Sequence, residues 1–349
     1  MQRRDIFKTL AAGMALGAAL PGKLFSQTDR TFPRHPKKLG PGDTVGVIAP
    51  GTAVSDPDDL ASAEEALGYF GLRMRLAPHV ERGSGYKTRS PRERASDLEE
   101  MFEDPAIDAV FAIRGGYGSV QILDLIDYSI IDKNPKIFLG YSDITALHLA
   151  IQRNCSLVTF HGPMLLAPFT RFTMQSFEQA LFQTEAPREL RNPEAASGFR
   201  QKYPVRTVAS GSAKGRTAGG NLSIISALMG TPYEIETDGK ILLIEDIGES
   251  PYRIDRMLTQ LRLSGKLGRA AGIVFGLCKD CDPGLSQMYT WDSTLGEVLD
   301  NLLGDIGIPV LSGLTFGHTD DQMTIPIGVE AALDADSGVL TLLESGVSE

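Results

Sequence analysis

The amino-acid sequence predicts an α/β protein with two domains, the first of which is built on a parallel sheet. Strand-like and helix-like segments alternate four times between residues 44 and 154, and this rhythm produces a parallel sheet with helices on both faces. The second half mixes strand-like and helix-like segments at less regular spacing. A chain of 349 residues is long enough for two domains that each bury a core.

In the N-terminal domain, expected at residues 35–165, short apolar runs bounded by glycine or proline predict buried strands. The expected strands are residues 44–50, 72–78, 107–116 and 136–142. The expected helices are residues 56–71, 90–104, 119–127 and 143–154. Asp56 and Ser90 stand where helix N-caps are needed. Ligands of such sheets bind beyond the carboxyl ends of the strands.

Residues 166–204 are polar and show no clear period, so we expect a linker there. A second domain is expected at residues 205–349, and Asn221 caps its first helix. Its other expected elements are helices at residues 250–265 and near 291–303, and strands at residues 240–246, 271–277, 309–317 and 338–344.

Residues 1–30 predict an export signal that is separate from the fold. Arg3 and Arg4 precede an apolar run from Leu10 to Leu20, which is too short to span a bilayer. The two arginines resemble the twin-arginine motif, which serves proteins that fold before they are exported. We expect a periplasmic or exported protein with no stable membrane insertion after signal cleavage. An uncleaved N-terminal anchor is the alternative.

The charge and the cysteines exclude several classes of protein. A net charge of -10 spread along the chain argues against a nucleic-acid partner. The three cysteines are too few for a disulfide scaffold. Cys278 and Cys281 have CxxC spacing without a second such pair for zinc, so we expect two incidental thiols or one local disulfide.

Ser142, in the stretch FLGYSDITALHLA, lies where a predicted strand turns into a helix. A nucleophilic serine needs an exposed corner, a base and N–H groups that stabilise an oxyanion. The helix expected to begin at Asp143 would direct unpaired N–H groups toward the serine oxygen. Taken alone, the corner also suits a serine that merely caps the helix.

The glycine-rich turn RGGYGS, residues 114–119, follows another predicted strand and favours the catalytic interpretation. Such a turn leaves backbone N–H groups free to face a ligand. The spacing of neither dinucleotide-binding nor P-loop motifs is present. We therefore expect the N–H groups of Gly116 and Asp143 to form an oxyanion hole.

Two histidines are candidates for the base. His318 lies in a loop between glycine and polar residues, and loops are where functional residues concentrate. His161, at the end of a strand, is its rival. His148 has the position of a packing residue on the helix after Ser142, and His35 lies before the first strand.

A carboxylate must orient the imidazole and stabilise its charged form. Glu245 fits this role because it closes an apolar strand, where a charged residue needs a reason. The alternatives are Asp246, Asp143, Asp320 and Asp321.

Five stretches together resemble the LD-carboxypeptidase family of serine peptidases, which includes the microcin C self-immunity peptidases. They are RGGYGS, LGYSDITALH, GGNLSIISALMGTPYE, LLIEDIGESPYRIDRML and GLTFGHTDDQMTIPIG, and they occur in the family's order from about residue 43 onward. The resemblance implies a homodimer with a Rossmann-like N-terminal domain and a β-rich C-terminal domain. It implies Ser142 as nucleophile, Glu245 as acid and His318 as base, with Gly116 and Asp143 at the oxyanion hole.

The resemblance also implies the activity: hydrolysis of the L,D-peptide bond to a terminal D-alanine in peptidoglycan tetrapeptides, with no metal or cofactor. Arg114 is a candidate for pairing the terminal carboxylate of such a peptide. Two alternatives remain open at this point. One is a microcin-type peptidase acting on aminoacyl- or peptidyl-adenylates, and the other is a noncatalytic protein that binds peptidoglycan peptides.

Overall fold

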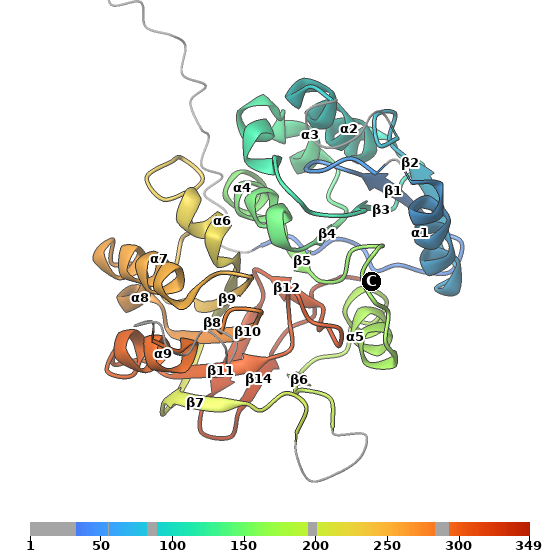
Figure 1. Ribbon diagram of the computed structural model, residues 1–349. Helices are drawn as coiled ribbons and strands as arrows, with labels where there is room; N and C mark the ends of the chain where they lie inside the picture. Colours follow the sequence, from blue (N-terminus) through green and yellow to red (C-terminus); the bar gives the residue numbers. More distant parts are fainter. Residues whose placement is uncertain (1–32, 55, 82–88, 195–200, 283–292) are drawn as a thin grey trace, which may run out of the picture.

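The computed structural model describes residues 33–54, 56–81, 89–194, 201–282 and 293–349 (Figure 1). The predicted export signal lies outside these residues. None of the helices in this part of the chain is both long and apolar enough to cross a membrane.

The N-terminal half forms a six-stranded sheet in the order β12-β5-β4-β3-β1-β2. Its strands are β1 (Thr44–Ile48), β2 (Arg73–Leu76), β3 (Ala109–Ala112), β4 (Ile137–Gly140), β5 (Thr159–His161) and β12 (Ile325–Ile327). The first five are mutually parallel, as the alternation of segments predicts. β12 is antiparallel to β5 and comes from the far end of the chain.

Helices cover both faces of this sheet (Figure 1). They are α1 (Pro57–Tyr69), α2 (Pro91–Glu103), the 3-10 helix η2 (Ser119–Leu125), α3 (Tyr128–Lys133), η3 (Ser142–Ile144), α4 (Thr145–Cys155) and α5 (Arg171–Leu181). The Asp56 and Ser90 caps form as predicted, and Ser90 makes a full capping box with Glu93.

The helix predicted at residues 119–127 is instead the 3-10 helix η2, which is followed by the separate helix α3. Gly118, with φ of 129°, precedes η2, and the buried carboxylate of Asp143 accepts a hydrogen bond from the Ser119 N–H. Asp127 then caps α3. The helix predicted from Asp143 begins two residues later, because Ser142–Ile144 forms the short turn η3.

The C-terminal half forms an eight-stranded sheet in the order β6-β14-β13-β8-β9-β10-β11-β7. Its strands are β6 (Arg188–Leu190), β7 (Arg206–Ala209), β8 (Ser212–Asn221), β9 (Ile241–Ile247), β10 (Gly272–Lys279), β11 (Val310–Leu314), β13 (Glu330–Asp334) and β14 (Val339–Leu342). The four central strands, β8 to β11, are parallel, and antiparallel strands extend the sheet on both sides.

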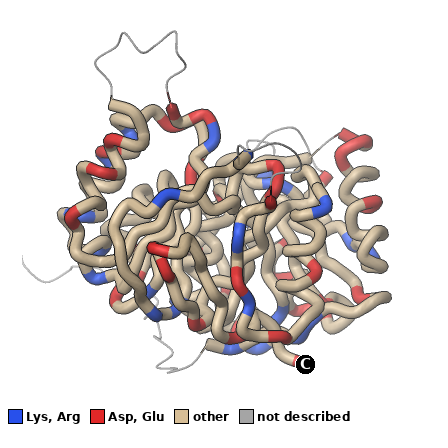
Figure 2. Tube along the Cα trace, turned by 90° about the horizontal axis from the view of Figure 1, so that it is seen from below, with Lys and Arg blue, Asp and Glu red and all other residues tan. Residues whose placement is uncertain are grey.

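The helices of the second half are α6 (Leu222–Ala227), α7 (Pro251–Leu263), α8 (Lys266–Arg269) and α9 (Leu295–Leu303). They lie beside this sheet, with α7, α8 and α9 away from the first half and α6 next to α4 (Figure 1). Asn221 caps α6 through the Ile224 N–H, as predicted. In the trace of the described residues, basic and acidic positions are interspersed (Figure 2).

The segment at residues 166–204, expected to be a linker, contains α5 and β6. α5 is amphipathic and buries Thr173, Ser176, Phe177, Ala180 and Leu181, which recur at helical spacing. β6 pairs with β14 at the edge of the second sheet. The linker prediction is therefore wrong for these two elements: the helical spacing in α5 was masked by neighbouring polar residues, and β6 is a three-residue edge strand that needs few apolar residues.

Candidate active site

The loops that follow β1, β3 and β4 meet at the carboxyl ends of these strands. Glycines let the three loops approach one another closely: a Cβ on Gly51 would overlap the Asp143 carboxylate, and one on Gly115 would lie 3.4 Å from Ser142 Oγ. Two buried arginines of the α2 region hold these loops from behind. Arg89 donates to the carbonyl groups of Ala49 and Gly51, and Arg94 donates to those of Pro50 and Gly118.

Neither arginine was predicted from the sequence, since Arg94 lies in an ordinary polar helix and Arg89 lies just before its N-cap. Both are almost fully buried, at 3% exposed for Arg89 and 1% for Arg94. Burial lowers the pKa of both guanidinium groups, although their usual pKa is high enough to keep them charged. A buried cation whose partners are mostly backbone carbonyls has no recognisable sequence pattern.

Ser142 stands at the strand-to-helix corner in the left-handed backbone region, with φ of 64°. This conformation is uncommon for a residue with a side chain and is typical of strained turns at functional sites. Gly140 permits the corner, because a Cβ there would lie 2.8 Å from the Ile144 side chain. The structure thus favours a serine presented to the cavity over a helix cap, and its side chain caps neither η3 nor α4.

Ser142, His318 and Glu245 lie in one hydrogen-bonded row. His318 Nε2 is 3.1 Å from Ser142 Oγ, and His318 Nδ1 is 2.7 Å from Glu245 Oε2. An ionised carboxylate only accepts hydrogen bonds, so Nδ1–H donates to Glu245 and Nε2 is left to accept the serine proton. Of the two histidines that the sequence left open, the structure places His318 in this row.

Glu245, on β9, is fully buried, and one of its oxygens faces His318. The Glu245 carboxylate can lie this close to the His318 loop only because residue 317 is glycine: its φ is 84°, and a Cβ there would overlap Glu245 Oε2. Tyr141 packs edge-on against the His318 ring at 4.9 Å between ring centroids. Burial and the charge of Glu245 raise the pKa of the Tyr141 hydroxyl to about 12, which keeps Tyr141 neutral.

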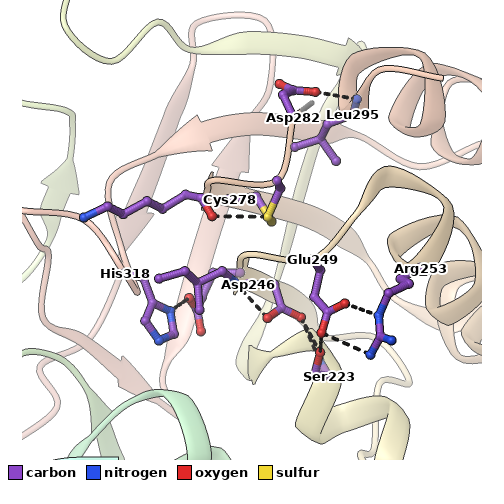
Figure 3. Close-up of a disulfide and its surroundings, with 12 residues drawn as sticks. Ser223, Asp246, Glu249, Arg253, Cys278, Asp282, Leu295 and His318 are labelled. Atoms are coloured by element: carbon purple, nitrogen blue, oxygen red, sulfur yellow. Dashed lines mark hydrogen bonds and ion pairs between the residues drawn. A yellow bond between two sulfur atoms is a disulfide. The ribbon is translucent and has the colours of Figure 1, made fainter. Parts of the chain in front are cut away.

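None of the other carboxylates weighed for this role contacts His318. Asp246 accepts hydrogen bonds from Ser223, as Figure 3 shows, and it also accepts one from the Asn221 side chain at the start of α6. Asp321 is held by Thr170, Lys202 and Tyr203. Asp320 lies 3.9 Å from Lys279 Nζ, and Asp143 faces the glycine turn.

The row crosses the interface between the two sheets. Ser142 follows β4 of the first sheet, while Glu245 lies on β9 of the second. The Asn221 N–H donates to Thr145 Oγ1 at 2.9 Å, which ties the start of α6 to the start of α4. A Cβ on Gly220 would overlap Thr145, so that glycine permits the contact.

The two N–H groups expected at an oxyanion hole are unpaired within the described residues: neither the Gly116 nor the Asp143 N–H donates a hydrogen bond there. Gly116 has a positive φ of 97° and is backed by Thr52, with which an added Cβ would collide. Burial raises the pKa of the Asp143 carboxyl group, and hydrogen bonds from Ser119 and Gly118 oppose this shift. The Asp143 side chain therefore orders the glycine turn while its N–H group stays available.

A cavity of about 410 Å³ opens beside Ser142 and His318. Residues from the glycine turn and from the segment after β5 line this cavity, and Asp59 and Arg114 are the acidic and the basic member of the lining. The full lining is Asp59, Ile113, Arg114, Gly115, Gly116, Tyr141, Ser142, Met164, Leu166, Ala167, Pro168 and His318. Its size suits a short peptide end.

The two cysteines with CxxC spacing form the disulfide Cys278–Cys281, which was one of the two expectations (Figure 3). It lies at the end of β10, where Cys278 pairs in register with Asp246 of β9. Cys155 is a free, buried thiol.

His161, the rival base, is buried and has no hydrogen-bond partner for either ring nitrogen among the described residues. Its neighbours are aromatic: Tyr141, His148 and Phe316. Burial, with the nearby His148 and His318, lowers the pKa of His161 well below its usual value. Burial also lowers the pKa of His148 to about 4, although a hydrogen bond to the Gly140 carbonyl opposes the shift.

Because these buried histidines are neutral in the folded protein, we expect the free energy of unfolding to fall in acid. Because the pKa of His161 is lower in the folded protein, the unfolded chain binds the proton more readily below pH 6.5, and the free energy of unfolding falls as the pH falls. For each such histidine the loss is at most about 1.4 kcal/mol for each pH unit below 6.5. Urea unfolding of wild type and of His161→Gln at pH 7 and at pH 5 measures this change in the free energy of unfolding. The variant should lose less stability between the two pH values; an equal loss would contradict the prediction.

The fold and the site define a class of protein: a two-sheet α/β protein with serine, histidine and glutamate hydrogen-bonded in a row, which is the arrangement of hydrolytic enzymes. Two models of one protein family match this chain. The model of the LD-carboxypeptidase N-terminal domain matches residues 45–162, and that of the LD-carboxypeptidase C-terminal domain matches residues 214–333. The chain belongs to the LD-carboxypeptidase family, which confirms the resemblance carried by the five motifs.

Curated relatives cover almost the whole chain. A probable murein peptide carboxypeptidase of Bacillus subtilis strain 168 is 42% identical over 319 residues, covering 90% of this chain and 95% of that protein. The microcin C7 self-immunity protein MccF of Escherichia coli is 30% identical over 344 residues, covering 90% and 98%.

Solved structures support the fold. MccF in its apo state matches with a TM-score of 0.81 at 28% identity, covering 90% of this chain and 100% of that one. The muramoyltetrapeptide carboxypeptidase of Oxalobacter formigenes matches with a TM-score of 0.74 at 29% identity, covering 88% and 100%. The predicted α/β fold, with its Rossmann-like parallel sheet, is therefore confirmed.

Proposed function

We propose that this protein is a serine-type LD-carboxypeptidase that removes the terminal D-alanine from peptidoglycan tetrapeptides. The observation that carries the proposal is the hydrogen-bonded row of Ser142, His318 and Glu245 at the edge of a cavity sized for a peptide end. Relatives named murein peptide carboxypeptidase and muramoyltetrapeptide carboxypeptidase support the choice of substrate.

In the proposed mechanism, His318 Nε2 takes the proton of Ser142 as Oγ attacks the carbonyl carbon of the L-centre before D-alanine. The tetrahedral oxyanion accepts hydrogen bonds from the N–H groups of Gly116 and Asp143. The C–N bond then breaks, and the D-alanine amine leaves with the proton that His318 returns. A water molecule, deprotonated by His318, hydrolyses the acyl-serine and restores the enzyme. Glu245 stabilises the imidazolium in both steps.

Arg114 is proposed to pair the terminal carboxylate of the substrate. Its side chain is exposed at the cavity and makes no ion pair with the residues that the structure describes. A guanidinium matches a carboxylate in two-point geometry, which would select chains that end beside Ser142.

A second candidate is a microcin-type peptidase acting on aminoacyl- or peptidyl-adenylates, which the likeness to MccF favours.

A decisive experiment incubates the purified protein with D-alanine-ending tetrapeptides, containing lysine or diaminopimelate, and separately with a non-natural aminoacyl-adenylate substrate. Release of D-alanine supports our proposal. Cleavage of the adenylate alone supports the second candidate, and cleavage of neither, with binding of the tetrapeptide retained, indicates a noncatalytic peptide-binding protein.

We propose further that the protein works outside the cytoplasm, after export by a twin-arginine signal. The disulfide Cys278–Cys281 supports this location, since disulfides persist in oxidising compartments. Replacing Arg3 and Arg4 together by lysine is expected to leave the protein in the cytoplasm, as measured by cell fractionation. Unchanged export of this variant would contradict the twin-arginine route.

The homodimer that the family resemblance implies is likewise a proposal for this chain. Sedimentation of the purified protein at several concentrations measures its mass in solution. A mass of one chain at every concentration would refute the dimer.

A further inference from the structure

A second hollow, of about 370 Å³, continues from the cavity at Ser142. The two share Asp59, Leu166 and Ala167 in their linings. One wall of the second hollow is a face of α1 that recurs at helical spacing: Asp59, Ser62, Glu65, Ala66 and Tyr69. The other wall comes from residues 165–174. Tyr69 is 66% exposed, so its ring is open to a ligand that enters the hollow.

The second hollow carries negative charge without a matching positive charge. Asp59 and Glu65 belong to its lining, and the described lining contains no lysine, arginine or histidine. Neither carboxylate makes an ion pair or a side-chain hydrogen bond within the described part of the chain. Both are therefore available to a ligand, and the chemistry that fits two carboxylates beside an aromatic ring is a positively charged amino group.

We propose that Asp59 binds the amino group at the end of the side chain of the substrate residue whose carbonyl Ser142 attacks. Glu65 lies six residues further along α1, about 9 Å by the helix rise, and adds negative charge to the same hollow. This inference rests on the proposed function. In a peptidoglycan tetrapeptide that residue is a diamino acid, whose side chain carries an amine several bonds from the scissile carbonyl. Asp59 lies where the two hollows join, so a side chain that leaves the first cavity passes it.

The charges decide which part of the peptide enters the second hollow. Arg114 lines the first cavity and is absent from the lining of the second, so the terminal carboxylate belongs to the first. The D-glutamyl residue, on the other side of the diamino acid, carries a free carboxylate that Asp59 and Glu65 would repel. The side-chain amine is the group next to the scissile bond that these carboxylates attract.

The test compares two peptides, L-Ala-γ-D-Glu-L-Lys-D-Ala and the same peptide acetylated on the lysine side chain. Wild type should show a higher kcat/KM for the free amine. Asp59→Asn should lower the ratio of the two kcat/KM values about tenfold, the size of effect expected for a hydrogen bond to a charged group. Asp58→Asn is the matched control: Asp58 is also in the first turn of α1 but lines neither hollow, and its ratio should equal that of wild type.

Dissociation constants of both peptides for Ser142→Ala and for the double variant with Asp59→Asn separate this inference from the proposed function. If wild type releases no D-alanine but Asp59→Asn still lowers the preference for the free amine in binding, the proposed function fails and amine recognition stands. Equal binding of the two peptides, binding of neither, or an equal loss for both on Asp59→Asn would overturn the inference.

Discussion

Replacing Ser142 by alanine is expected to lower the rate of D-alanine release by about a millionfold, to the residual rate that binding and the oxyanion hole provide. The variant removes Oγ, the atom that lies 3.1 Å from His318 Nε2 and forms the covalent intermediate in the proposed mechanism. Release of D-alanine from the tetrapeptide, followed by chromatography, measures the effect.

The control for this experiment is Ser129→Ala, because Ser129 is an exposed serine in α3, away from the cavity. It should retain the wild-type rate. A Ser142→Ala protein that released D-alanine at the wild-type rate would refute serine catalysis.

Ser142 also stores conformational strain that a glycine would relieve. Its φ of 64° costs a residue with a side chain of the order of 1 kcal/mol, which glycine does not pay. Ser142→Gly should therefore be inactive and yet have a higher free energy of unfolding than Ser142→Ala in urea titrations. A lower value for glycine would show that the corner is unstrained.

The second large effect is expected from Glu245→Gln, which should lower kcat about ten-thousandfold with a small change in KM. The amide has the size of the carboxylate but no charge, and it can present an N–H to His318 Nδ1. That contact favours the imidazole tautomer with its proton on Nε2, where it cannot accept the proton of Ser142. Steady-state kinetics with the tetrapeptide measure both constants.

Glu249→Gln is the matched control for this variant. Glu249 lies four residues further along the chain, pairs with Arg253 and does not contact His318 (Figure 3). Its kcat should remain close to the wild-type value. A Glu245→Gln protein with wild-type kcat would exclude Glu245 from the acid role.

The sequence predicted those parts of the fold that depend on local signals. Asp56, Ser90 and Asn221 were recognisable as caps because each precedes a helical pattern and offers a side-chain oxygen to its first turn. The alternation of strand-like and helix-like segments is also a local signal, and it predicted the parallel sheet. The helix α5 also had a local signal, the spacing of Thr173, Phe177 and Leu181, which the surrounding polar residues masked.

Features that depend on distant contacts were beyond local reasoning. From the residues alone, His318, in a loop, and His161, at the end of a strand, were both candidates for the base. The difference between them is tertiary: His161 is enclosed by aromatic rings, whereas His318 reaches both Glu245 and Ser142. The antiparallel pairing of the three-residue strand β12 with β5 also has no local signal, because its partner lies more than 160 residues earlier.

The strand β12 comes late in the chain and yet completes the first sheet. The segment that carries His318 runs from β11, in the second sheet, to β12, which forms an edge of the first. On the ribosome, residues near 327 emerge long after those of β5. The first sheet of a nascent chain therefore lacks this edge strand at the stage when Ser142 is present and His318, the proposed base, has not been synthesised. We therefore expect a chain that ends before His318 to release no D-alanine, and a chain that ends before β12 to have a lower free energy of unfolding than the full chain.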